Sequence, residues 1–111
     1  MDVAQFLISL LHAFSALDFV EKVDLHREVF ILKGRVILKK NRFLQIYFNE
    51  ITETTAFALV EGNKRIWGVD FDKIRGWHMH PLENPETHRI ISSTTIEQIV
   101  NLFADVWKRL P

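Results

Sequence analysis

The chain has 111 residues, of which 48% are hydrophobic and 12% aromatic, and its 14 lysines and arginines balance its 14 aspartates and glutamates. This composition predicts one globular domain over residues 1–111 and excludes a disordered chain, a strongly basic nucleic-acid arm and an acidic tail. Because the chain has no cysteine, disulfides, thiolate nucleophiles and cysteine metal ligands are excluded as well. Five histidines remain as the main candidates for chemistry.

The first predicted element is a helix over residues 3–17. Apolar residues recur in this range at helical spacing, and Asp2 followed by Gln5 has the pattern of a capping box. The range is too short and too polar for a membrane span, and it lacks the basic leader and cleavage site of a secretory signal. We therefore expect a cytoplasmic protein with no membrane contact.

Residues 19–71 are predicted to form the sheet, because apolar residues recur there with a period of two. The segments 39–42 and 61–64 are turn-like, and 51–54 is a third polar break. Such short connections leave no room for crossover helices, so the strands must be antiparallel. We predict four or five strands joined as a meander, with the 39–42 turn as a solvated hairpin tip.

Residues 73–93 show no sustained period and are predicted to form a long loop with a short strand around His78. A second capping box at 94–97 then begins a helix that runs to the C-terminus. The predicted fold class is therefore α+β. Its antiparallel four- to five-stranded meander sheet carries an N-terminal and a C-terminal helix, both packed on one face.

Three of the five histidines, His78, His80 and His88, lie close together in the predicted loop. If residues 77–80 are extended, His78 and His80 project from the same face, and the loop can return His88 to them. Asp70 lies just upstream and is the carboxylate that we expect beside these rings. The sequence thus places three imidazoles and a carboxylate within reach of one another.

Two kinds of site have this chemical make-up. In a metal centre, the three neutral imidazoles would bind zinc or iron while Asp70 orients one ring. In a metal-free site, one histidine would accept a proton and another would donate one, as in RNA cleavage that uses the substrate's own 2′-hydroxyl. Arg75 or Arg89 would then bind the phosphate, and Trp77 is the candidate to contact the substrate beside them. In a third interpretation, the histidine pair only adds polarity to the surface.

Four stretches of the chain, in their order, resemble the TumE-type toxins of bacterial and archaeal toxin–antitoxin pairs. They are GRVILKKNRFLQIYF, FALVEGNKRIWGVD, GWHMHP with a later histidine, and SSTTIEQI. The resemblance covers residues 34–106. The positions that match the family are Asp70, His78, His80 and His88. Phe71 and Asp72 stand where members often have Asn and Pro.

This resemblance implies a growth-inhibiting toxin that acts on RNA and is neutralised by a small DNA-binding antitoxin. The stretch GWHMHP is also similar to the zinc-binding motif of JAMM-type metalloproteases, but His88 and Ile91 stand where that motif needs a serine and an aspartate. The leading expectation is a toxin-like ribonuclease that uses the three histidines. The alternative is a metal-binding protein or metalloenzyme through the same residues.

A non-enzymatic interaction module is the third hypothesis. Ile31, Ile37, Phe43 and Tyr47 lie on the otherwise polar side of their predicted strands, so that face of the sheet is not expected to be fully solvated. A homodimer or an antitoxin segment would cover it. The balanced net charge further implies that any RNA contact depends on a few placed arginines and lysines rather than on a global field.

Overall fold

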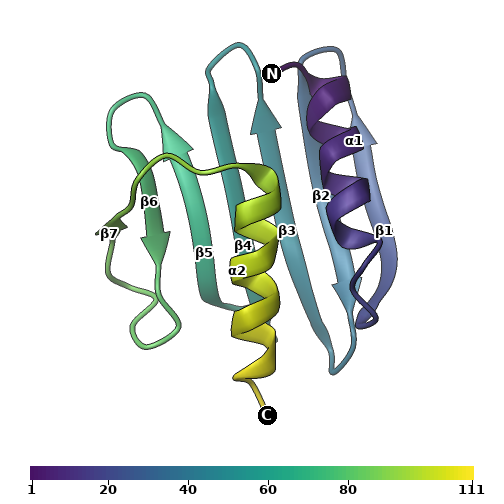
Figure 1. The fold of residues 1–111 in the computed structure, drawn as a ribbon, viewed down its shortest axis with the longest axis vertical. Helices are drawn as coiled ribbons and strands as arrows, with labels where there is room; N and C mark the ends of the chain where they lie inside the picture. The colour runs from purple at the N-terminus through teal and green to yellow at the C-terminus, as the bar shows by residue number, and fades with distance from the viewer.

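A computed structural model describes residues 1–111 as one sheet with two helices (Figure 1). The helices are α1 (Val3–Phe14) and α2 (Ile96–Lys108). The strands are β1 (Val20–Arg27), β2 (Ile31–Leu38), β3 (Arg42–Asn49), β4 (Thr54–Glu61), β5 (Lys64–Asp72), β6 (Gly76–His80) and β7 (Arg89–Ile90). They follow chain order across the sheet, and every neighbouring pair is antiparallel, which makes a meander.

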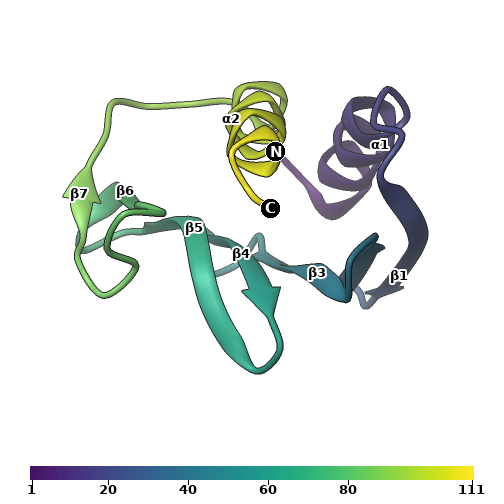
Figure 2. The ribbon, with the colours of Figure 1, turned by 90° about the horizontal axis from the view of Figure 1, so that it is seen from below.

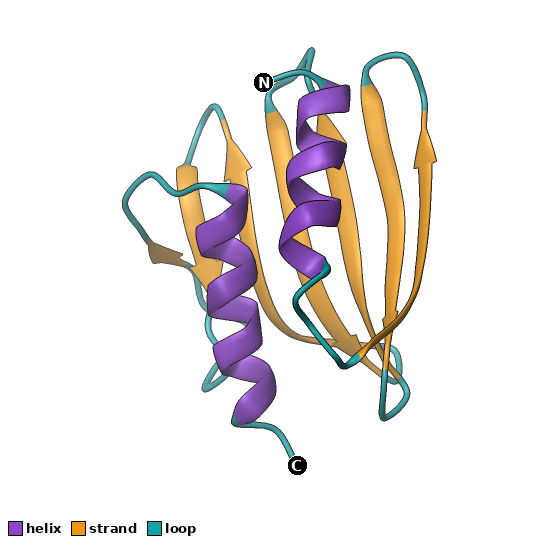
Figure 3. Cartoon of the chain, turned by 45° about the vertical axis from the view of Figure 1, so that its right-hand side comes forward, coloured by secondary structure: helices purple, strands orange, loops and turns teal.

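Both helices cover the same face of the sheet (Figures 2 and 3). Phe6 of α1 stacks on Phe48 of β3 with ring centroids 4.3 Å apart, and Phe103 of α2 lies 6.1 Å from Trp67 of β5. These rings belong to one cluster of 20 buried apolar residues that joins the helices to the sheet. Burial of this apolar surface is the main term that stabilises the fold. We call the other side of the sheet, which no helix covers, the open face.

The α+β class, the antiparallel meander and the placement of both helices on one face confirm the prediction. The predicted number of strands is wrong, because the sheet has seven strands rather than four or five. β1 gives a weak pattern because six of its eight residues are exposed, and apolar alternation requires a buried face. β7 has only two residues, both exposed, and is defined by its pairing with β6. The short strand expected around His78 is β6.

Both helices begin at capping boxes, the second one residue later than predicted. Asp2 and Gln5 make both reciprocal hydrogen bonds of the box that opens α1. The box of α2 uses Thr95 and Gln98 instead of the expected pair at 94 and 97. α1 ends at Phe14, short of the predicted residue 17. Neither helix is long and apolar enough to cross a membrane.

The turn between β2 and β3 is solvated only at its tip. Lys40 and Asn41 have φ angles of 62° and 59°, in the left-handed region, within the three residues that separate the paired Leu38 and Arg42. Arg42, however, is 5% exposed and donates hydrogen bonds to Oε2 of Glu61 at 2.6 Å and to the main-chain oxygen of Pro111 at 3.1 Å. The prediction of a solvated turn is therefore wrong at Arg42, which ties the chain end after α2 to the sheet.

Candidate functional site

Strands β5 and β6 bring two histidines and an aspartate together on the open face. Asp70 pairs with His78 across these strands, and Gly68 pairs with His80. Because side chains alternate along a strand, the side chains of Asp70, His78 and His80 project from the same face. Oδ2 of Asp70 lies 3.0 Å from Nε2 of His80 and 3.5 Å from Nε2 of His78. One carboxylate oxygen therefore faces both rings.

The loop of residues 81–88 adds the third histidine. The loop starts beside α2, where Glu83 accepts a hydrogen bond from Arg109, and its later part reaches the open face, where the main-chain oxygen of Pro85 is 3.1 Å from Nδ1 of His80. The ring centroid of His88 is 4.5 Å from that of His80 and 5.4 Å from that of His78. One ligand nitrogen from each ring lies within 4.8 Å of those of the other two. We call these three histidines together with Asp70 the histidine cluster.

The two rings of β6 are buried, with His78 1% and His80 2% exposed. Nδ1 of each ring is 3.1 Å from a main-chain carbonyl oxygen, that of Gly76 for His78 and that of Pro85 for His80. A carbonyl oxygen only accepts hydrogen bonds, so both Nδ1 atoms carry a proton and donate it. Each Nε2 then faces Asp70 either with a lone pair, which the carboxylate repels, or with a second proton on a charged ring.

The Nε2 atom of His78 is buried and has no hydrogen-bond partner. Its 3.5 Å approach to Oδ2 of Asp70 is close enough for an ion pair, but the same oxygen already bonds Nε2 of His80 at 3.0 Å. A buried polar atom without a partner costs about 1–3 kcal/mol. The Nε2 of His78 therefore lacks a partner that a bound cation or an added proton would supply.

His88 differs from the other two rings because it is exposed and contacts an arginine. Nη1 of Arg75 lies 3.2 Å from Nδ1 of His88, and because a guanidinium only donates, the ring accepts with a lone pair. Desolvation, and then the positive charges of His80 and Arg75, lower the pKa of His88 below its usual value. Nε of Arg75 donates to Asp72 at 3.0 Å, and the main-chain N–H of Arg75 lowers the pKa of that carboxyl. Asp72 therefore positions Arg75 rather than joining the cluster.

Arg65 lies beside the cluster, and the sequence analysis did not identify it. It donates to the main-chain oxygen of Pro85 at 3.4 Å, and its Cδ is 3.6 Å from the place that a Cβ on Gly68 would occupy. Strict alternation along β5 would put Arg65 on the helix-covered face. A bulge in the β4–β5 pairing beside Val60 shifts it to the open face instead. No pattern in the sequence marks this bulge.

Two residues predicted to contact substrate, Trp77 and Arg89, lie on the helix-covered side. The ring of Trp77 is 5.1 Å from that of Phe71, and Arg89 pairs with Met79 and lines a cavity beside α2. Alternation along the strand explains this placement, since residues next to a histidine on β6 point to the opposite face. Of the two arginines proposed from sequence, only Arg75 reaches the histidine cluster.

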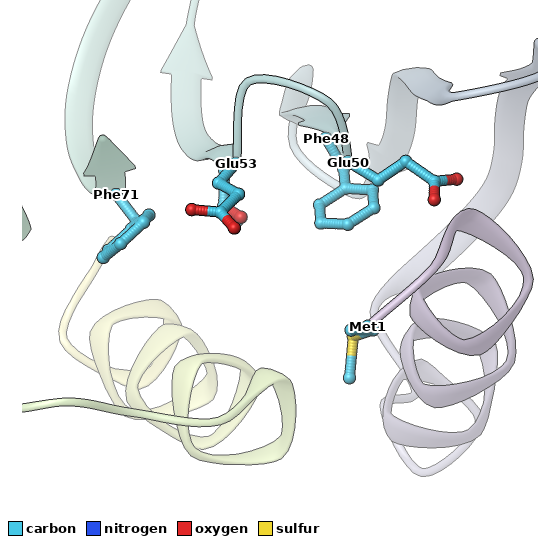
Figure 4. A pocket seen from close by; sticks show the side chains of 6 residues that line it. Met1, Phe48, Glu50, Glu53 and Phe71 are labelled. Atoms are coloured by element: carbon cyan, nitrogen blue, oxygen red, sulfur yellow. The ribbon is translucent and has the colours of Figure 1, made fainter. Parts of the chain in front are cut away.

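The molecule also has a cavity of about 380 Å³ near its N-terminus, which is separate from the cluster (Figure 4). Its carboxylates already have partners, because Glu50 accepts from the main-chain nitrogen of Val3 at 3.3 Å and Glu53 lies 3.7 Å from Nζ of Lys73. Its lining contains no histidine. The histidine cluster is therefore the better candidate for a functional site.

Comparison of the chain with protein-family models, with curated proteins and with solved structures found no match. The resemblance to TumE-type toxins therefore stays a prediction, and the function has to be inferred from the geometry of the cluster.

Proposed function

We propose that the histidine cluster binds one divalent transition-metal ion, zinc or iron, and that the protein is a metal-binding protein or metalloenzyme. The observation that carries this proposal is the buried Nε2 of His78, which has no partner although it faces Asp70 and the two other rings. Three imidazole nitrogens and a carboxylate oxygen form a donor set that suits zinc and non-haem iron. A bound cation would accept the lone pairs that otherwise repel the carboxylate.

The outer hydrogen bonds of the cluster support the same proposal. Metal-binding histidines usually donate their other ring N–H to a carbonyl or carboxylate, which fixes the ring and its tautomer. His78 and His80 do this through Nδ1, to the main-chain oxygens of Gly76 and Pro85. Their Nε2 atoms are thereby held toward Asp70 and ready to coordinate.

His88 would complete the ligand set at the exposed end. Zinc–nitrogen bonds of about 2.1 Å place neighbouring ligand atoms roughly 3.4 Å apart, so the nitrogens now within 4.8 Å would move closer together. If His88 coordinates through Nδ1, it must give up its hydrogen bond with Arg75, which frees Nη1 of Arg75 to bind an anion while Asp72 still holds the rest of the guanidinium. An ion held on this side would remain open to solvent and would supply an activated water for hydrolysis.

Isothermal titration with Zn²⁺, after treatment with a chelator, tests the proposal. We expect one equivalent per chain. His88→Ala is the informative variant, because His88 is exposed and its loss should weaken binding at least about tenfold without unfolding the protein. His26→Ala is the matched control, since this exposed histidine lies 3.5 Å from Asp24 and outside the cluster. The proposal fails if neither Zn²⁺, Fe²⁺ nor Co²⁺ binds to the wild type.

A second candidate function is metal-free RNA cleavage by a toxin-like protein. It is supported by the unequal environments of two neighbouring rings: Oδ2 of Asp70 lies 3.0 Å from Nε2 of His80, whereas His88 has a lowered pKa and an arginine beside it. His88 would take the proton from a 2′-hydroxyl, and His80 would give one to the leaving 5′-oxygen. Arg75 would stabilise the charge on the phosphorus-bound oxygens.

Cleavage and growth assays separate this second function from the first. We expect RNA cleavage that persists in EDTA, growth inhibition on expression, and loss of both in His80→Ala. An antitoxin protein or a second copy of the chain would be the partner that restrains the activity. Cleavage that requires added metal would reject the metal-free mechanism and support the metal centre.

A further inference from the structure

The open face continues from the histidine cluster as two rows of side chains that cross five neighbouring strands. Strand pairing sets each row, because residues opposite one another lie side by side on one face. From β2 to β6, the first row is Lys33, Tyr47, Ala56, Asp70 and His78. The second row is Arg35, Gln45, Ala58, Gly68 and His80. Both rows therefore end at a ring of the cluster.

The middle of these rows consists of the smallest side chains. Ala56, Ala58 and Gly68 have no atom beyond Cβ, and the side chain of Arg65 extends over Gly68 toward Pro85, so Arg65 stands between β4 and the cluster. On the opposite side, the loop of residues 81–88 bonds His80 through Pro85 and blocks access. A large substrate that lies across β4 would therefore meet Arg65 at the edge of the cluster.

The far end of the rows carries an aromatic ring and free positive charge. Tyr47 is half-buried, and the guanidinium of Arg35 lies 4.4 Å from the ring centroid of Phe43 on the same face. Lys33 and Arg75 pair with carboxylates at 3.4 Å and 2.9 Å, whereas Arg35 and Arg65 make no salt bridge. These two unpaired arginines lie on either side of the small residues.

These features match the chemistry of single-stranded RNA. Bases stack on aromatic rings that stand on an open sheet, and arginines contact the phosphates between them. Adjacent strands are about 4.8 Å apart, so β3 to β6 span about 14 Å. A sheet of four strands holds about two or three bases in known RNA-binding domains. The width between Tyr47 and the cluster therefore fits a short stretch of unpaired nucleotides.

We propose that single-stranded RNA binds across the open face, with a base on Tyr47, phosphates at Arg35 and Arg65, and one phosphodiester at the histidine cluster. The last contact rests on the proposed function, whereas the binding surface from β2 to β5 does not. The inference names RNA as the substrate class of the cluster. It also separates the residues that bind RNA from those that would react with it.

Fluorescence anisotropy with a labelled single-stranded RNA of about 12 nucleotides, in EDTA, tests the binding surface. We expect Tyr47→Ala to weaken binding about tenfold, while Tyr47→Phe keeps most of it. Arg35→Gln should lower the slope of log affinity against log salt by about 0.7, the value for one phosphate contact. Lys108→Gln removes an equal charge from α2 and should change neither affinity nor slope.

The outcomes distinguish this inference from the proposed function. The variants at Tyr47 and Arg35 lie outside the histidine cluster, so a wild-type protein that binds RNA but neither binds metal nor cleaves RNA would reject only the proposed function. Unchanged affinity in both Tyr47→Ala and Arg35→Gln would overturn the inference. Tighter binding of a DNA oligonucleotide of the same sequence would also overturn it. So would a dimer that Tyr47→Ala dissociates in sedimentation, because a second copy of the chain would then cover the face.

Discussion

The helix-covered face and the open face are built from the same strands, but they differ in whether their buried groups have partners. On the helix-covered face, rings such as Phe48 and Trp67 pack against α1 and α2 in one continuous apolar cluster. On the open face, His78 is just as buried, yet its Nε2 has no partner. Groups that lower stability in this way are typical of sites that need them for function. The comparison separates a face that packs around an apolar core from a face that leaves a buried polar atom without a partner.

The largest expected effect is on the helix-covered face. Phe103→Ala removes a fully buried ring that contacts Phe14, Phe19 and Trp67. We expect the free energy of unfolding to fall by about 3–5 kcal/mol, because the change leaves a cavity in the core. Urea denaturation followed by tryptophan fluorescence measures this loss. A decrease below about 1 kcal/mol would show that the helices contribute less than the packing indicates.

We expect a metal ion bound at the histidine cluster, on the open face, to stabilise the folded protein. An ion that binds only the folded state at 100 times its dissociation constant adds about 2.7 kcal/mol to the free energy of unfolding. We therefore expect a rise in melting temperature with added Zn²⁺, measured by differential scanning calorimetry, and a smaller rise in His88→Ala. An equal rise in both proteins would place the bound ion outside the histidine cluster.

We expect Asp70, on the open face, to affect metal affinity much more than the stability of the fold. Asp70→Asn removes the negative charge that faces both Nε2 atoms, while an amide of the same shape can donate to one of them. We expect metal affinity to fall about 10–100-fold, and the free energy of unfolding without metal to stay within about 1 kcal/mol of the wild type. Titration calorimetry and urea denaturation give the two values. Unchanged metal affinity would exclude Asp70 from the site.

The smallest expected effect concerns an exposed pair on the helix-covered side. The side-chain hydrogen bond from Arg109 lowers the pKa of Glu83 below 4.5. Its contribution to stability is thus present above pH 4.5 and is lost as the pH falls through the lowered value. Glu83→Gln should therefore be less stable than the wild type near neutral pH, and the difference should vanish in acid. A difference independent of pH, measured by thermal melts, would contradict this assignment.

Local sequence patterns were enough to predict the fold class and the common face of two histidines. Period-two alternation and short turns imply an antiparallel meander, and capping boxes imply where helices begin. The same reasoning counted too few strands, because an edge strand such as β7, with two exposed residues, shows no alternation. It also placed Trp77 and Arg89 near the histidines, although alternation itself sends them to the helix-covered face.

By itself, the sequence determined an α+β fold without cysteine chemistry, and it placed His78 and His80 on one face of a strand, because periodicity depends only on neighbouring residues. Only the tertiary structure decided that the loop of residues 81–88 returns His88 to these rings. It alone also decided that a bulge turns Arg65 to the open face. Loop paths and bulges depend on contacts between distant segments, which no local pattern encodes.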